Sequence, residues 1–321
     1  MNELMLFSGS GSPELTQKIA DNLGVKVGDS LVKKFSDGEF RVQINESVRG
    51  DDVFIVQSMV TPVNEHLMEL LITIDAFKRA SARRINVVLP YYAYARQDRK
   101  VKPREPVTAK LVANLLSSAG ASRLLTTDLH AGQIVAFFDI PVDNLYGGPI
   151  IAKYLAEKMD VSDDIVVVSP DVGGVARAQG LAEYLGAPMA IIVKRRPEPN
   201  KVEVVQIIGE VQGKRAIMID DIIDTAGSIV NGANALMARG AKEVYAAATH
   251  AVLSGPAIDR LKESPITKLI VTDTLPLTRE AKDSGKIEVV SIASLLANAI
   301  NNIHYEKSVS NIFSKHWKGH N

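Results

Sequence analysis

One short run of acidic and small residues combines two kinds of binding chemistry. The segment 215–228 reads RAIMIDDIIDTAGS, so that apolar residues lead into Asp220 and Asp221 and a tight turn follows at Asp224. The backbone N–H groups of such a turn, with the positive end of the next helix dipole, form a pocket for a phosphate. Small side chains let the phosphate come close, and two hydroxyl groups add hydrogen bonds. The run therefore predicts an anion site.

The acidic pair beside the turn adds a second chemistry. Carboxylates accept hydrogen bonds from the vicinal hydroxyl groups of a sugar and also suit a hydrated magnesium ion. Phosphate plus hydroxyl groups indicates a sugar phosphate. The alternative is that Asp224 only caps a helix and that the pair is solvated, which a short pattern leaves open. The residues that we expect at this site are Asp220, Asp221, Asp224, Thr225, Ala226, Gly227 and Ser228.

Short apolar runs alternate with stretches of helical periodicity, which is typical of parallel sheets with crossover helices. Between two runs, Asn64–Ala80 has apolar residues at three- and four-residue spacing and predicts a helix with one buried face. The Asp-Gly pair within residues 35–40 predicts a protruding β-hairpin. The candidate strands are Leu4–Phe7, Leu31–Phe35, Val53–Gln57, Ile85–Leu89, Arg123–Thr127, Ile165–Ser169, Met189–Val193, Ala216–Ile219, Val244–Thr249 and Lys268–Thr272.

The two halves of the chain contain similar segments in the same order. Residues 87–97 (VVLPYYAYARQ) resemble residues 166–179 (VVVSPDVGGVARAQ), and residues 123–132 (RLLTTDLHAG) loosely resemble residues 215–227 (RAIMIDDIIDTAG). We interpret this as a duplicated α/β domain. Ligands of open α/β sheets bind at the carboxyl ends of strands, so the chemistry is expected in loops that follow strands.

Turn residues at 146–149 (YGGP) mark the predicted domain boundary. We expect a first domain over 1–146 and a second over 147–302 that carries the sugar-phosphate turn. The remaining segment, 303–321, is expected to pack back on the first domain.

Composition narrows the possible functions. The 321 residues contain 37 Lys plus Arg and 37 Asp plus Glu, so no bulk field attracts nucleic acid or anionic lipid. The absence of cysteine excludes a disulfide scaffold, a cysteine nucleophile and a thiolate metal site. The first residues lack the pattern of a secretory signal, and no apolar run approaches the roughly 18 residues of a membrane span. We expect a cytoplasmic protein with no nucleic-acid or membrane partner.

The complete turn resembles the phosphoribosyl-binding signature of the type I phosphoribosyltransferase fold. Further motifs occur in the order found in ribose-phosphate diphosphokinases, also called phosphoribosyl diphosphate synthetases, and resemble the common bacterial class I. These motifs are FSDGE (35–39), YARQDRK (94–100), TTDLHAGQI (126–134), PDVGGVARA (170–178), KRRP (194–197) and SVSNIF (308–313). The departures are Ala226, where many members have Gly, and Ser228, where many have Thr.

The resemblance implies an α/β protein of two duplicated phosphoribosyltransferase-like domains, each a mainly parallel sheet flanked by helices. It implies that the anomeric hydroxyl of ribose 5-phosphate attacks the β-phosphorus of MgATP, which gives AMP and 5-phosphoribosyl 1-diphosphate. ATP would be the co-substrate, Mg2+ the cofactor and phosphate an activator. A homo-oligomer is implied, a hexamer with active sites shared between subunits.

The resemblance also gives roles to individual residues. Lys194 and Arg196 would be catalytic and close over the triphosphate, and Arg196 would also contact ribose 5-phosphate. His130 and Asp171 would lie at magnesium, directly or through water. The ATP-binding set would be Phe35, Asp37, Glu39, Arg96, Gln97 and Arg99, with the first three reaching a neighbouring subunit's site. A regulatory anion site would comprise Ser47, Arg49, Ser81, Ser308 and Ser310.

Local interpretations of these residues stay open. A solvated charged loop at Lys194, an ordinary polar His130 and a simple hairpin turn at Asp37 are each compatible with the sequence. Residues 9–14 begin like a dinucleotide fingerprint, but Glu14 replaces the third Gly, so a helix start is favoured. No P-loop pattern is present.

Two other functions compete with the diphosphokinase. A phosphoribosyltransferase would use the same sugar-phosphate turn, but the ATP-associated segments argue against it. A catalytically silent regulatory protein would keep the fold, but retention of Lys194, Arg196, His130 and Asp171 argues against that.

Overall fold

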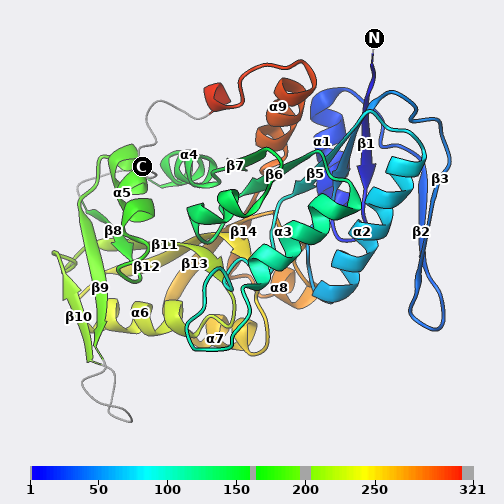
Figure 1. Ribbon diagram of the computed structural model, residues 1–321. Coiled ribbons are helices and arrows are strands. Elements are labelled where there is room, and N and C mark those ends of the chain that lie inside the picture. The colour runs from blue at the N-terminus through cyan, green and yellow to red at the C-terminus, as the bar shows by residue number, and fades with distance from the viewer. Residues whose placement is uncertain (1, 160–163, 196–203, 313–321) are drawn as a thin grey trace. The chain divides into compact units, whose positions relative to one another are not determined.

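The chain forms two compact α/β units in the computed structural model, which describes residues 2–159, 164–195 and 204–312 (Figure 1). The first unit comprises Met1–Tyr146, Thr274–Pro276 and Ser291–Ile312. The second contains Gly147–Asp273 and Leu277–Val290. In each unit helices flank a mainly parallel sheet, as the sequence predicts.

The sheet of the first unit is fully parallel, and its strands follow one another in chain order. Strand β4 is buried along its whole length, because it lies inside the sheet with helices on both sides. The five strands are β1 (Leu4–Ser8), β4 (Asp52–Val56), β5 (Arg84–Leu89), β6 (Arg123–Thr127) and β7 (Val142–Leu145), in the order β1-β4-β5-β6-β7.

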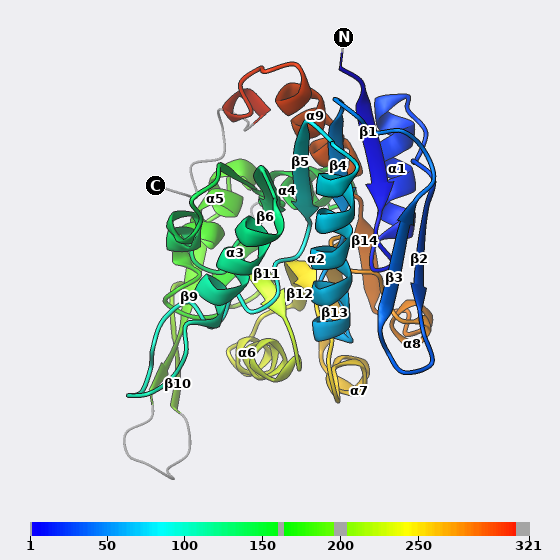
Figure 2. The same cartoon turned by 45° about the vertical axis from the view of Figure 1, so that its right-hand side comes forward.

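The helices of this unit pack in pairs. Helix α1 contacts α9, and α2 contacts α3. Figure 2 shows α2 lying along the sheet of this unit, where Leu70, Ile74 and Phe77 are buried as the apolar periodicity predicts. The helices are α1 (Pro13–Leu23), α2 (Val63–Arg79), α3 (Thr108–Ala119) and α9 (Ala293–His304), with short 3-10 helices η1 (Gly132–Phe137) and η2 (Ser310–Ile312).

The predicted hairpin is confirmed. Strands β2 (Ser30–Lys34) and β3 (Phe40–Ile44) pair antiparallel. The turn between them needs Gly38, whose φ of 98° is in a region that side-chain-bearing residues rarely adopt. Helix α2 packs against β3, so the hairpin is attached to the first unit.

The sheet of the second unit contains a reversal of strand order. Strand β9 follows β8 in the chain but lies on one side of it, whereas β11 lies on the other, so β8 and β11 flank a topological switch point. Among the strands of this sheet that the structure describes, only β10 runs antiparallel to its neighbour. The strands are β8 (Ile165–Ser169), β9 (Met189–Arg195), β10 (Val204–Ile208), β11 (Arg215–Ile223), β12 (Glu243–Ala251), β13 (Ile266–Thr272) and β14 (Ile287–Val290), in the order β10-β9-β8-β11-β12-β13-β14.

Helices cover both faces of this sheet, because its strands are apolar on both sides. Val166 and Val168 pack toward α6 (Gly227–Ala238) and α7 (Ala257–Glu263). The alternate residue Val167 packs toward α4 (Gly148–Lys158) and α5 (Val175–Leu185). The short helix α8 (Arg279–Asp283) precedes β14.

The division of the chain differs from the predicted boundary at its C-terminal side. We predicted that 147–302 belongs to the second domain, whereas Ser291–Ile312 groups with the first unit. The physical reason is that α9 buries its apolar face against α1. No helix in the described part of the chain is long and apolar enough to span a membrane.

Candidate active site

The turn between β11 and α6 presents backbone N–H groups that the helix itself does not use. The first intrahelical bond runs from Val230 N–H to the Ala226 carbonyl at 3.0 Å, so the N–H groups of residues 227–229 have no acceptor within the helix. Ala226 is the N-cap, with φ 59° and ψ 0° and no side-chain cap. The side chains of Thr225 and Ser228 are exposed beside it. This arrangement is suited to a phosphate.

Several contacts hold the turn in place. The Ser254 hydroxyl donates to the Asp224 carboxylate, and Ser254 N–H donates to the Asp224 carbonyl at 3.1 Å. Arg260 Nη1 donates to the Thr225 carbonyl at 2.9 Å. A Cβ atom at Gly227 would lie 3.2 Å from that same nitrogen, so the position leaves little room for a side chain. The turn is thus preformed by the segment that follows β12.

The acidic pair lies inside β11 rather than after its end, which corrects the sequence expectation. The strand continues to Ile223 because β12 pairs with it that far. Arg177 Nη1 donates to Asp220 Oδ1 at 3.2 Å, and Arg177 Nη2 lies 3.6 Å from Asp221 Oδ1. Asp221 N–H also donates to Asp220 Oδ1, at 2.9 Å. One guanidinium thus serves both carboxylates.

The electrostatics of the pair favour a ligand that compensates negative charge. Burial, together with the neighbouring Asp221 carboxyl, raises the pKa of Asp220 to about 7, and the Arg177 guanidinium only partly opposes this rise. An ionised Asp220 is therefore disfavoured in the free protein. Hydroxyl donors of a sugar or a nearby cation would stabilise the ionised form.

The loop after β8 brings Asp171 to the same edge of the sheet. Strands β8 and β11 are parallel neighbours, so their carboxyl ends meet at the switch point. The Asp171 side chain is exposed and accepts from Gly174 N–H at 2.8 Å, while the Ser169 hydroxyl donates to its carbonyl at 2.6 Å. Asp171 therefore has a fixed carboxylate that faces solvent.

A magnesium ion fits this donor set only with further oxygen ligands. Among the described residues, no three His, Asp or Glu side chains gather closely enough to hold a metal ion. Mg2+ usually keeps several waters and substrate phosphate oxygens and takes one or two carboxylates, so the exposed Asp171 suits it. His130, whose side chain is also exposed, belongs to the first unit, and Asp171 belongs to the second.

The predicted ATP-binding segment forms the loop after β5 in the first unit. Gln97 accepts from the Thr108 hydroxyl at 2.5 Å, which ties the loop to the start of α3. Asp98 accepts from Gln133 Nε2 at 2.6 Å, and Gln133 lies in η1, which directly follows the loop that contains His130. The structure therefore brings the ATP segment and the His130 loop together. The predicted ATP-binding residues Arg96, Gln97 and Arg99 are all exposed.

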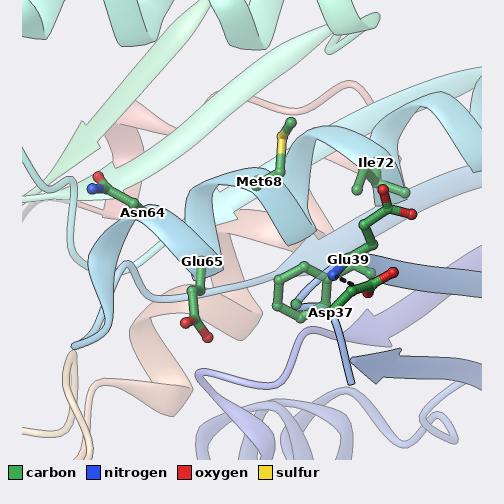
Figure 3. A pocket seen from close by; sticks show the side chains of 8 residues that line it. Asp37, Glu39, Asn64, Glu65, Met68 and Ile72 are labelled. Carbon is green, nitrogen blue, oxygen red and sulfur yellow. Dashed lines mark hydrogen bonds between the residues drawn. The ribbon is translucent and has the colours of Figure 1, made fainter. Parts of the chain in front are cut away.

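The predicted hairpin residues occupy the exposed tip between β2 and β3. The side chain of Phe35 is 45% exposed, and Asp37 and Glu39 are exposed. Figure 3 shows the tip beside α2, with Asp37 accepting from Glu39 N–H at 3.0 Å. The groove between the tip and α2 also contains Glu65, which pairs with Lys34 at 2.7 Å. Apolar side chains, those of Phe40, Met68 and Ile72, also line this groove.

Protein side chains fill the loop that begins like a dinucleotide fingerprint. Glu69 accepts from Ser10 N–H at 2.8 Å, and Gln57 accepts from Gly11 N–H at 2.8 Å. Pro13 then begins α1. The expectation of a plain helix start is confirmed.

The residues of the predicted regulatory site all lie in the first unit. Gly50 N–H donates to the Ser81 carbonyl at 3.0 Å, which joins the loop of Ser47 and Arg49 to Ser81. The hydroxyl groups of Ser308 and Ser310 are 2.7 Å apart. The predicted regulatory residues thus form two small groups within this unit. One contains Ser47, Arg49 and Ser81, and the other contains Ser308 and Ser310.

The structure describes the backbone of only one of the two predicted catalytic residues. Lys194 lies in β9, where its backbone is in register with Val205 of β10. Arg196 lies outside the described residues.

The sequence analysis did not single out Arg177, Ser254 or Arg260. Each contacts a residue of the predicted sugar-phosphate site from an element distant in the chain. No local pattern predicts such contacts. Only the position of Arg177 within the motif 170–178 hinted at a role.

A mainly parallel sheet flanked by helices, with an acidic pair and the start of a helix at its switch point, defines a phosphoribosyltransferase-like α/β class of protein. Residues 4–120 match the model of the N-terminal domain of ribose phosphate pyrophosphokinase. Residues 177–314 match the model of the phosphoribosyl synthetase-associated domain.

Curated relatives and a solved structure agree with these matches. The chain is 59% identical over 313 residues to the ribose-phosphate pyrophosphokinase of Caldanaerobacter subterraneus subsp. tengcongensis, with 98% of each chain covered. It is 58% identical over 312 residues to that of Bacillus caldolyticus, which covers 97% of this chain and 98% of the relative. The crystal structure of phosphoribosylpyrophosphate synthetase from Mycobacterium smegmatis matches with a TM-score of 0.90 and 46% identity, over 95% of this chain and 100% of that one. The chain belongs to the ribose-phosphate pyrophosphokinase family.

Proposed function

We propose that the chain transfers the diphosphoryl group of ATP to the anomeric hydroxyl of ribose 5-phosphate and gives 5-phosphoribosyl 1-diphosphate and AMP. The observation that carries the proposal is the anion-binding turn of α6 beside the Asp220–Asp221 pair at the switch point. Membership of a family of ribose-phosphate pyrophosphokinases supports the same reaction.

The acceptor is held by the second unit in this proposal. The N–H groups of residues 227–229 and the hydroxyls of Thr225 and Ser228 bind the 5-phosphate. The carboxylates of Asp220 and Asp221 accept hydrogen bonds from the ribose hydroxyls. Three anchoring points fix the sugar, and this leaves the anomeric oxygen free to react.

The reaction forms one bond and breaks one bond. The anomeric oxygen attacks the β-phosphorus, and the bond from that phosphorus to the oxygen bridging the α- and β-phosphates breaks. The bridging oxygen leaves with AMP, and the hydroxyl proton passes to solvent. Because this chemistry needs alignment and charge compensation more than a nucleophile, positioned cations are the main catalytic groups.

Lys194 and Arg196 supply these cations. Arg196 forks two phosphate oxygens, whereas Lys194 provides a point charge where negative charge develops. In this proposal Lys194 and Arg196 close over the triphosphate. Closure also excludes water, and this suppresses hydrolysis of ATP.

The nucleotide is bound by groups from two subunits. Arg96, Gln97 and Arg99 contact ATP from the loop after β5, and the hairpin residues Phe35, Asp37 and Glu39 of another copy contact the adenine. The exposed phenyl ring supports a role in a neighbouring site. We therefore propose a homo-oligomer, a hexamer.

Magnesium is the cofactor in this proposal. When bound, the ion neutralises part of the triphosphate charge. Asp171 would hold it, with His130 in contact directly or through water. The fixed, exposed carboxylate of Asp171 supports this role.

The remaining predictions extend the proposal. Phosphate would activate the enzyme at the site of Ser47, Arg49, Ser81, Ser308 and Ser310. We also propose that the chain has two duplicated domains, as predicted from the sequence, and that the protein is cytoplasmic.

One assay tests the activity against both competing functions. AMP formation from ATP and Mg2+ should depend on ribose 5-phosphate. AMP production without the acceptor, or none with it, would overturn the proposal. A phosphoribosyltransferase would instead release pyrophosphate from phosphoribosyl diphosphate and a base, and a silent regulator would do neither.

A further inference from the structure

Tyr94, in the loop after β5, has a backbone conformation that aromatic residues rarely adopt. Its φ is 65°, and among the described residues other than glycine it is the only aromatic one with a positive φ. The Cβ atom crowds the backbone there, so a bulky residue keeps this conformation only where surrounding contacts enforce it. Its neighbours Ala93 and Ala95 are both buried, which fixes the chain on either side. Strained residues of this kind gather at functional sites.

The side chain of Tyr94 ties the loop to helix α2. Its hydroxyl donates to Asn64 Oδ1, and Asn64 lies in the first turn of α2. Figure 3 shows the Asn64 amide directed away from Asp37 and Glu39, so this contact is separate from the hairpin tip. A glycine would adopt the left-handed conformation without strain but could not form the link. The tyrosine side chain therefore contributes something that the backbone alone does not need.

A tight turn begins at Tyr94 and contains two of the predicted ATP-binding residues. Gln97 N–H donates to the Tyr94 carbonyl at 2.9 Å, so Arg96 lies at the corner of the turn and Gln97 at its end. Both side chains are exposed, whereas Ala95 between Tyr94 and Arg96 is buried. Because Tyr94 is the first residue of the turn, its backbone angles set the direction in which Arg96 and Gln97 project.

The turn is attached to a different helix at each end. At the far end, the Gln97 carbonyl accepts from Ala109 N–H at 3.2 Å and its side-chain oxygen accepts from the Thr108 hydroxyl at 2.5 Å, which fastens this end to α3. At the near end, the Tyr94 hydroxyl supplies the link to α2. Helices α2 and α3 contact each other, so both attachments belong to one packed pair. Without the Tyr94 link, the turn could pivot about Gln97.

We propose that Tyr94 is a positioning residue that holds Arg96 and Gln97 in the arrangement that binds ATP. It acts through these two residues, because its link to α2 orders the turn before the nucleotide arrives. A turn that is already ordered loses less conformational entropy when the nucleotide binds. The inference rests on the proposed function and deepens it by adding a residue that supports the nucleotide site.

Steady-state kinetics of the full-length Y94F and Y94G variants test the inference. Y94F loses only the hydroxyl link, so its KM for ATP should rise about three- to tenfold, the usual worth of one hydrogen bond. Y94G also loses the ring and frees the backbone, and its KM for ATP should rise roughly 10–100-fold. The KM for ribose 5-phosphate should change little, because the predicted acceptor turn belongs to the second unit. In Y94F kcat should stay near the wild-type value, since ground-state binding is what is lost.

Two further variants show whether the link itself is responsible. Y154F is the matched control: it removes the same atom from a tyrosine whose hydroxyl donates to Glu288 at 2.5 Å in the second unit. It should leave both KM values unchanged. N64A removes the acceptor of the Tyr94 hydroxyl, so it should resemble Y94F. The double variant Y94F/N64A should be no weaker than either single variant, because both remove one and the same bond.

Equilibrium binding provides a readout that does not depend on turnover. Calorimetric titration uses α,β-methylene ATP with Mg2+, an analogue whose bridge between the α- and β-phosphates is not cleaved. The affinity for this analogue should fall in Y94F and Y94G by the same factors as the KM for ATP rises. If the wild type binds the analogue but forms no AMP with ribose 5-phosphate, the proposed function is overturned, and the binding series still decides the inference.

Three results would reject the inference. An unchanged KM for ATP in Y94F and N64A does so, whether or not Y94G folds. Equal rises in the KM values of both substrates would mark Tyr94 as a general support of the fold. Additive effects of Y94F and N64A would show that the hydroxyl link to α2 is not the means by which Tyr94 acts.

Discussion

At the scale of single residues, the acidic pair makes the free protein less stable than it could be. The raised pKa of Asp220 means that the folded chain disfavours its ionised form. Below the ordinary value of 3.8 the group is protonated in both folded and unfolded chains and costs nothing. As pH rises from 3.8 to about 7, the unfolded chain ionises first, so stability falls over this window.

Removal of this charge should stabilise the protein and impair binding. D220N should unfold at a higher temperature than the wild type at pH 8, and the difference should vanish near pH 4. Ribose 5-phosphate affinity should fall at both pH values. Thermal unfolding and calorimetric titration measure the two effects. D283N, on an exposed carboxylate, is the control, and a D220N variant less stable than wild type at pH 8 would contradict the argument.

The N-cap Ala226 gives a second prediction at this scale. Its left-handed backbone costs a side-chain-bearing residue about 1–2 kcal/mol, and a β-branched residue more. A226G should therefore stay within about 1 kcal/mol of the wild type, since relief of strain and the added freedom of the unfolded chain nearly cancel. A226V should lose stability and ribose 5-phosphate affinity. Urea unfolding and titration distinguish them, and equal behaviour of both variants would refute the strain argument.

At the scale of elements, a buried ion pair fastens the end of α9 to the start of β4. Asp52 accepts from Arg84 Nε at 2.7 Å and lies 2.9 Å from His304 Nδ1. Burial alone would raise the pKa of Asp52, but the hydrogen bonds from Arg84 and His304 outweigh it and hold this pKa below its usual value. The pair thus adds stability above pH 3.8, which is lost as pH falls through the lowered pKa.

R84M should therefore destabilise the first unit. It leaves a buried carboxylate without its main partner, which typically costs about 3–5 kcal/mol. Urea unfolding at pH 7 measures the loss, and the difference from wild type should shrink as Asp52 becomes protonated in acid. The control R79M removes an exposed pair with Asp75 and should have no measurable effect. A pH-independent loss in R84M would point to packing instead.

The elements themselves were predictable where their patterns are strong. All candidate strands are present, because buried parallel strands are nearly continuous apolar runs. Four strands were not among the candidates: β3, which only the hairpin signal implied, β7, β10 and β14. Strands β7 and β14 are only four residues long and partly polar, VDNL and IEVV. The extension of β11 through Asp220 depends on pairing with β12, which no local pattern reveals.

The candidate site was likewise predictable where its chemistry is local, and not where it depends on contacts between distant elements. The anion-binding turn could be predicted because its chemistry is local: small residues and hydroxyls at a helix start. Arg177 could not, because its role arises from the meeting of α5 and β11. The C-terminal helix α9 shows no local sign that it belongs with α1.

At the scale of the whole molecule, the similar segments of the two halves of the chain belong to sheets whose strand orders differ. Strands β5, β6 and β7 lie side by side as β8, β11 and β12 do, in agreement with the sequence similarity. The neighbour on the other side differs, since β4 precedes β5 whereas β9 follows β8. Within the described residues, only the second unit therefore has a switch point, and the predicted sugar-phosphate turn lies there.

The proposed sharing of sites between subunits can be tested by complementation. F35A should be defective because it removes the hairpin ring, and K194A because it removes a catalytic cation. Each variant alone should have little activity. When the two are mixed, dissociated and reassembled, some sites combine an intact Lys194 on one subunit with an intact hairpin on its neighbour. Random assembly of equal amounts should restore about a quarter of the wild-type sites, because each condition is met half of the time.

Two controls give this result its meaning. Mixing without dissociation should restore nothing, and mixing two different Lys194 variants should restore nothing after reassembly. Light scattering must show that all variants keep the same oligomeric mass. If the F35A and K194A mixture stays at the mean of its components, the hairpin serves its own subunit.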